Sequence, residues 1–121
     1  MKIIVFGCQQ IAVDVLKFLF ERNDVDLSLV ITYELPLDKT YGYISVLDYC
    51  SERKIPVINP KLVSDDIVKT VLDIEPDIIL SIYYRKIFSQ SLIDELLYVI
   101  LSLSLNVNVI SELLFGSHDH V

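Results

Sequence analysis

The chain has 121 residues, of which 53% are hydrophobic and 22% charged, and its formal net charge is −7. This composition is typical of a globular domain and argues against intrinsic disorder. Nucleic-acid binding needs clustered Lys and Arg, whereas this acidic chain has only ten such residues, spread thinly, so a nucleic-acid partner is disfavoured.

The first half of the chain alternates apolar runs with amphipathic patterns. Lys2 to Phe6 predicts a strand that is buried on both faces, as in a parallel sheet. Apolar residues then recur at helical spacing from Ile11 to Phe20, and Asn23-Asp24 breaks this predicted helix. A second strand is predicted from Val25 to Thr32, and an exposed loop from Tyr33 to Gly42.

Further helices and strands follow in the same rhythm. Val46, Leu47 and Cys50 mark a helix with Ser45 as a possible N-cap. Residues 54–58 predict a brief strand in which Pro56 suits the first position or a sheet edge. Residues 64–66 predict the cap of a third helix, 77–82 a fourth strand, and 89–97 a short helix.

Strands that alternate with helices in this way predict one α/β domain. Parallel strands need crossover connections, and these are right-handed. The sequence therefore predicts a Rossmann-like, doubly wound, mostly parallel open sheet with helices on both faces, over residues 1–95. Residues 96–121 form a divergent apolar segment, without charge from Leu96 through Ser111, and a fifth strand could lie within it.

No targeting or membrane segment is predicted. MKIIVFG lacks the long apolar core and the cleavage site of a signal peptide. The run from Leu96 to Ile110 is interrupted by Ser and Asn and is too short to span a bilayer. We expect a cytoplasmic protein with two buried thiols, Cys8 and Cys50, and no metal site, because both histidines lie in the last four residues.

Ligands of open α/β sheets bind beyond the carboxyl ends of the strands, where three segments are expected. The first, Gly7-Cys8-Gln9-Gln10, contains one glycine and is not a GxGxxG loop, which disfavours a nicotinamide-dependent enzyme. Gly7 itself predicts a tight strand-to-helix turn. Gln9 and Gln10 could bind a ligand or cap the helix. The second segment runs from Tyr33 to Tyr43 and the third from Tyr83 to Ile87.

The third segment carries the most chemistry. Tyr83 and Tyr84 could flank a flat heterocycle, and Arg85 and Lys86 could meet a carboxylate or phosphate. Alternatively, the tyrosines pack beneath the following helix and the cations are solvated.

The motifs MKIIVFG, DLSLVIT, KIPVINP and PDIILSIYYRKI, in this order, resemble the N-terminal half of folate-dependent formyltransferases. The resemblance covers about residues 1–95 and is strongest to sugar N-formyltransferases, which use 10-formyltetrahydrofolate to formylate nucleotide-linked deoxyaminosugars of O-antigens and other surface polysaccharides. It implies that Tyr83, Tyr84, Arg85, Lys86 and Ile87 line the folate pocket. It also implies that Gln9, Gln10 and Tyr41 lie on the nucleotide-sugar or folate side of the cleft.

The resemblance also bears on catalysis. The family places a catalytic Asn and His in an N-x-H-P-S-L-L-P stretch and draws an Asp from a later loop. Here Asn108 matches the Asn, whereas Ile110 stands in place of the His and Ser111 in place of the Pro. His118, Asp119 and His120 carry suitable groups but lie at the terminus, where segments seldom converge on one reacting atom.

The resemblance therefore predicts a truncated formyltransferase that is inactive alone. Two alternatives remain open: a formyltransferase completed by a partner chain, and a non-catalytic nucleotide- or folate-binding module. The apolar segment needs a partner surface, so we expect a homodimer formed through it.

Overall fold

The computed structural model describes residues 1–33, 44–60, 65–82, 99–102 and 115–116 of the chain. Within these ranges strands and helices alternate, as the sequence predicts. In chain order they are β1 (Lys2–Gly7), α1 (Gln9–Phe20), β2 (Asp26–Ile31), α3 (Val46–Glu52), β3 (Val57–Ile58), α4 (Asp65–Ile74), β4 (Ile78–Ile82) and β5 (Val99–Ser102).

Four of these strands form an all-parallel open sheet in the order β3-β2-β1-β4. The short β5 pairs in parallel with the outer edge of β4, so a strand does lie inside the apolar run after Glu95. The predicted Rossmann-like α/β fold is confirmed.

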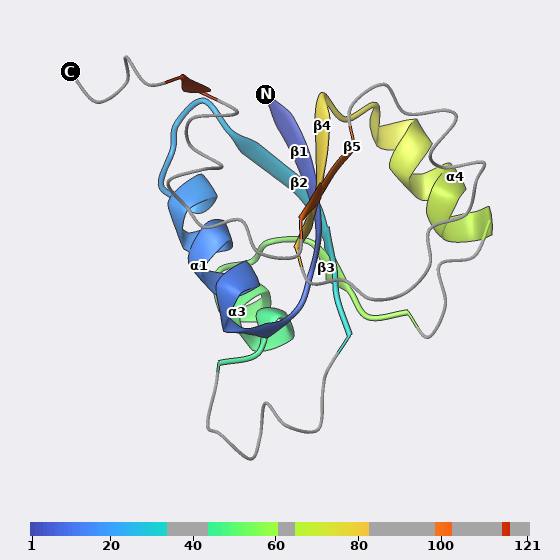
Figure 1. The fold of residues 1–121 in the computed structure, drawn as a ribbon. Coiled ribbons are helices and arrows are strands. Elements are labelled where there is room, and N and C mark those ends of the chain that lie inside the picture. The colour runs from blue at the N-terminus through green and yellow to red at the C-terminus, as the bar shows by residue number, and fades with distance from the viewer. Residues whose placement is uncertain (34–43, 61–64, 83–98, 103–114, 117–121) are drawn as a thin grey trace.

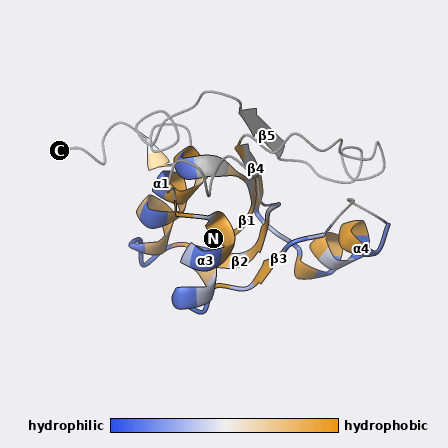
Figure 2. Cartoon of the chain, turned by 90° about the horizontal axis from the view of Figure 1, so that it is seen from below, coloured by the Kyte–Doolittle hydropathy of each residue, from blue (hydrophilic) through white to orange (hydrophobic). Residues whose placement is uncertain are grey.

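Helices cover both faces of the sheet. Figure 1 shows α1 and α3 on one side of the strands and α4 on the other. In β1, Ile3 and Val5 belong to the cluster beneath α1 and α3, whereas Ile4 and Phe6 belong to the cluster beneath α4. The strand is apolar at successive positions because its alternating side chains enter two separate cores, and Figure 2 shows this hydrophobic character along the strands.

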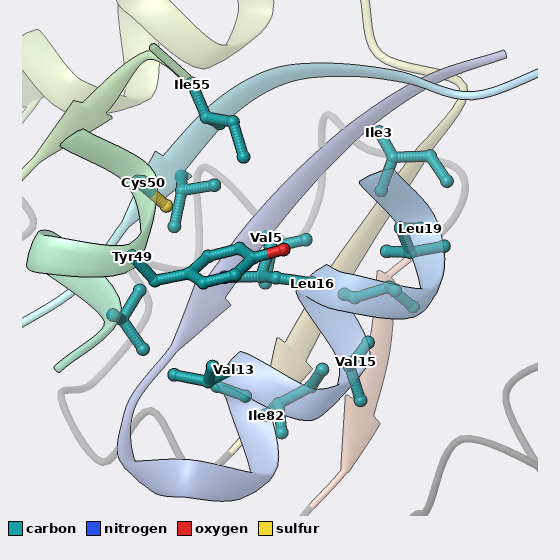
Figure 3. Packing of buried hydrophobic residues seen from close by; sticks show 14 residues of the cluster. Ile3, Val5, Val13, Val15, Leu16, Leu19, Tyr49, Cys50, Ile55 and Ile82 are labelled. Atoms are coloured by element: carbon teal, nitrogen blue, oxygen red, sulfur yellow. The ribbon is translucent and has the colours of Figure 1, made fainter. Parts of the chain in front are cut away.

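The core beneath α1 and α3 holds the larger set of buried side chains. Leu16 and Leu19 of α1 are fully buried, and Tyr49 of α3 is 2% exposed. Figure 3 shows the Tyr49 ring extending from α3 across the cluster toward Leu16 and Val5. Full burial of one such side chain stabilises a fold by about 1.5–3 kcal/mol, so this layer holds α1 and α3 onto the sheet.

The ends of α3 show how local sequence sets an element's limits. Ser45 caps its start, as predicted, by accepting a hydrogen bond from the Asp48 amide at 3.0 Å. At its end Lys54 has a φ of 58°, and the Ile55 amide donates to the Cys50 carbonyl at 2.9 Å. This is a Schellman ending, in which a left-handed residue closes the helix.

That ending shortens the strand predicted over residues 54–58. Lys54 and Ile55 are committed to the helix cap, so β3 contains only Val57 and Ile58. Pro56 lies directly before β3, which is an edge strand, and its carbonyl accepts from the Val30 amide at 2.8 Å. The sequence placed Pro56 at the first position of a strand or at a sheet edge because proline has no N–H to donate. Directly before an edge strand, that missing N–H costs the sheet no hydrogen bond.

Two smaller observations complete the fold. Val25 and Asp77, which the sequence placed in strands, lie just before β2 and β4 instead, and the Asp77 carboxylate accepts from the Lys2 amide at 2.7 Å. In the described part of the chain no helix has the length and apolar character needed to cross a membrane.

Cys50 offers a test of the α1–α3 core through pH. Burial raises the pKa of its thiol from 9.0 to about 11, and the nearby Arg53 charge opposes this only in part. The unfolded chain loses the thiol proton first as pH rises, so the thiol's contribution to stability is complete below about pH 9 and declines toward about pH 11. We expect the wild-type protein to lose its stability advantage over Cys50→Ala across that window, as measured by urea unfolding. A constant difference between the two would contradict burial of the thiol, since all other titrating groups are shared.

Candidate functional site

The chain reverses its direction of winding at β1, and this reversal defines the candidate site. It winds from β1 to β2 and β3 on one side, then crosses to β4 on the other side of β1. At the carboxyl ends of these strands Gly7 pairs with Ile82, and the Cys8 amide donates to the Ile82 carbonyl at 3.1 Å. Such a topological switch point separates the two crossover connections and is where open α/β sheets bind ligands.

Gly7 lets α1 start close against the end of β1. A Cβ at this position would lie 2.8 Å from the Ala12 Cβ and 3.4 Å from Val5 Cγ1. Atoms do not approach so closely without displacement, so the turn has room only for glycine. The predicted tight strand-to-helix turn is therefore confirmed, and it brings the first turn of α1 to the switch point.

Cys8 links the ends of β1 and β2. It is the N-cap residue of α1, and its side chain makes no capping hydrogen bond. Its thiol instead donates to the Tyr33 carbonyl at 3.4 Å and lies 3.9 Å from Thr32 Oγ1. Thr32 is 2% exposed and Cys8 is fully buried, so a small polar contact is enclosed at this edge. The prediction of two buried thiols is confirmed for Cys8 and Cys50.

The N-terminal end of α1 is electrostatically favourable for a bound anion. The first turn contains no acidic residue, and the backbone N–H groups of a helix N-terminus carry partial positive charge. Gln9 is the first residue of α1. Gln10 donates from its side-chain amide to Asp14 Oδ1 at 3.1 Å, four residues along the helix. That contact holds Gln10 along the helix surface rather than at its cap.

The remaining predicted site residues lie outside the described ranges. These are Tyr41, Asn108 and the folate-loop residues Tyr83, Tyr84, Arg85, Lys86 and Ile87. Their neighbours in sequence are placed: Ile82 ends β4 beside Gly7, and Tyr33 follows β2. Among the described side chains, no three His, Cys, Asp or Glu are grouped as metal ligands would be.

The sequence placed Tyr33 in the second candidate segment and Thr32 at the end of a predicted strand, but it did not predict that both contact Cys8. Their contacts with Cys8 depend on the parallel pairing of β1 with β2, which brings residues 24 and 25 positions apart together. The sequence indicated only that these two residues lie where a predicted strand ends. Compared with known proteins, the chain matches neither a family model nor a curated sequence.

Gly7→Ala tests the close approach at the switch point. The added methyl group would displace Ala12 or the strand end, and we expect a loss of about 1–3 kcal/mol in the free energy of unfolding. Ala12→Gly removes the opposing Cβ and alone costs about 1 kcal/mol in helix propensity. The double variant should lose less than the sum of the two single losses in urea unfolding. Strict additivity would show that the two positions do not meet.

Proposed function

We propose that this chain is a formyltransferase-type domain that binds 10-formyltetrahydrofolate beyond the carboxyl ends of β1 and β4 and does not transfer the formyl group unaided. The supporting observation is the switch point, where Gly7, Cys8 and Ile82 meet. Tyr83 follows Ile82 directly in the chain, so the loop with the strongest family resemblance starts at the point where this fold binds ligands.

The residue types in that loop suit a reduced folate. A pterin is a flat heterocycle, which the rings of Tyr83 and Tyr84 would flank, and the backbone after β4 would offer donors and acceptors to its edge. Arg85 and Lys86 would pair with the carboxylates of the glutamate tail. Ile87 would add an apolar wall.

The acceptor in this proposal is an amino group on a nucleotide-linked deoxyaminosugar, as in O-antigen biosynthesis. Gln9 and Gln10 at the start of α1, with Tyr41, would contact the nucleotide sugar. The first turn of α1 contains no acidic residue, and a helix N-terminus of this kind suits the diphosphate of such a substrate. A net charge of −7 favours this small acceptor over transfer RNA.

The proposed lack of unaided activity depends on residue 110. Formyl transfer to an amine needs an oxyanion to be stabilised and a proton to be accepted. Asn108 would supply one hydrogen-bond donor, but the Ile110 side chain has no ionisable proton and no lone pair. In the partner-chain alternative, a second chain would contribute the missing catalytic groups and restore formyl transfer. In the binding-module alternative, the chain would need no catalytic groups.

The proposal also covers assembly and location. We place the protein in the cytoplasm, and we propose a homodimer formed through the uncharged stretch between Leu96 and Ile110.

Folate binding is the first test. We expect the purified chain to bind a stable reduced folate such as 5-formyltetrahydrofolate in calorimetric titration. Tyr83→Ala and Tyr84→Ala should each raise Kd about tenfold, since an aromatic stacking partner is worth roughly 1 kcal/mol or more. Phe20→Ala is the matched control, because Phe20 is an aromatic residue, 48% exposed, at the far end of α1. Equal affinity of all four proteins would refute the proposed pocket.

Formyl transfer is the second test. With 10-formyltetrahydrofolate and an aminosugar nucleotide, the isolated chain should produce no formylated sugar above the uncatalysed rate, as followed by mass spectrometry. The folate titration reports separately whether the cofactor is bound. Turnover that disappears in Asn108→Ala would show that the chain catalyses transfer with its own residues and would overturn the proposed inactivity.

A further inference from the structure

Phe115 contacts the end of α1 although it lies far away in sequence. Its ring centroid is 6.0 Å from that of Phe18, and the ring planes meet at 61°, an edge-to-face arrangement. The guanidinium carbon of Arg22 lies 3.5 Å from the Phe115 ring centroid. Phe115 also packs, partly buried, against the core cluster beneath α1. An aromatic ring held by a second ring, a cation and the core is anchored from several sides.

Asp24 holds the cation in place. Arg22 donates through Nε to Asp24 Oδ1 at 3.0 Å and through a terminal nitrogen to Oδ2 at 2.9 Å. This two-bond fork fixes the plane of the guanidinium, which is the group that covers the Phe115 ring. The Arg22 side chain is only 26% exposed, against 59% for Asp24, so Arg22 is packed and Asp24 orients it from the solvent side.

The two described parts of the C-terminal segment lie toward opposite ends of the parallel strands. Ser102 ends β5 opposite Ile82, at the carboxyl edge. Phe18 and Arg22, which hold Phe115, lie at the C-terminal end of α1, where the chain turns back toward β2 (Figure 1). After Phe115, Gly116 has a φ of 82°, a left-handed conformation that glycine adopts without strain. The aromatic anchor is thus followed in the sequence by a residue that suits the left-handed backbone conformation found there.

We propose that Phe115 is an intramolecular latch that fastens the C-terminal segment to α1, with Phe18 and the Arg22–Asp24 pair as its catch. The segment is then held at two points, by β5 pairing with β4 and by Phe115 on α1. With the latch closed, the aromatic surface at the end of α1 is occupied by the chain itself rather than by a second copy.

The chain contains no tryptophan, which permits a direct test. In Phe115→Trp the single indole should emit at short wavelength and resist quenching by acrylamide. Adding Arg22→Ala should raise the open fraction about fivefold, as expected for the loss of one cation–π contact, and Asp24→Asn should act in the same direction. Arg53→Ala is the matched control, since Arg53 lies 3.9 Å from the Tyr49 ring on α3; it should leave the emission unchanged.

Several results would overturn the latch. The indole could be quenched as readily as a free tryptophan derivative, or Arg22→Ala could have no more effect than Arg53→Ala. Protection that increases with protein concentration would show that the catch holds the partner's Phe115 instead.

A second measurement avoids the tryptophan. In the chain with Phe115→Ala, hydrogen exchange should accelerate at the Glu21 and Arg22 amides, which bond to Lys17 and Leu19 carbonyls, by about fivefold. Exchange in β1 should not change. Unchanged exchange at the end of α1 would refute the latch even if Phe115→Trp failed to fold.

Discussion

The structure depends on the burial of β1 on all sides. It pairs with β2 along one edge and with β4 along the other, and Ile3, Ile4, Val5 and Phe6 are all 0% exposed. Because alternate side chains enter opposite faces, one strand supplies both cores, beneath α1 and α3 and beneath α4. A charged or small residue at one of these positions would therefore directly weaken the core that its side chain enters, the α1–α3 core for Ile3 or Val5 and the α4 core for Ile4 or Phe6.

The same position of β1 creates the candidate site. The connection from β1 leads to β2 on one side, whereas the connection after β3 leads to β4 on the other side of β1, so the two separate beside the carboxyl end of β1. Gly7 lets α1 begin there, Cys8 binds the end of β2 through Tyr33, and its amide binds the end of β4 through Ile82. The ends of three strands are thus joined around one turn. The proposed folate loop begins with Tyr83, directly after Ile82 at these joined strand ends.

Sequence patterns predicted the fold well because its determinants are local. The run from Lys2 to Phe6, the helical spacing of Ile11, Val15 and Leu19, and the Ser45 cap each act within a few residues. The failures come from interactions that reach farther or compete locally. Lys54 and Ile55 look extended but are taken by the α3 cap, and the Cys8–Tyr33 contact depends on strand pairing.

Phe115 shows the limit of sequence reasoning most clearly. It follows two leucines, which gave no reason to separate it from the apolar segment, and its partners Phe18 and Arg22 lie in another predicted element. The chemistry of the site was predicted from residue types and from family resemblance. Tyr83, Arg85 and Asn108 lie outside the described residues, so their roles remain proposals that depend on the geometry of their neighbours.

The central claim is that a reduced folate binds at the carboxyl ends of β1 and β4. Amide chemical shifts, recorded by NMR while 5-formyltetrahydrofolate is added to the wild-type chain, test it residue by residue. The account predicts the largest changes at Gly7, Cys8 and Ile82, with little change at Lys2 and Asp26 on the opposite edge. Changes centred on that opposite edge, or none at saturating folate, would contradict it.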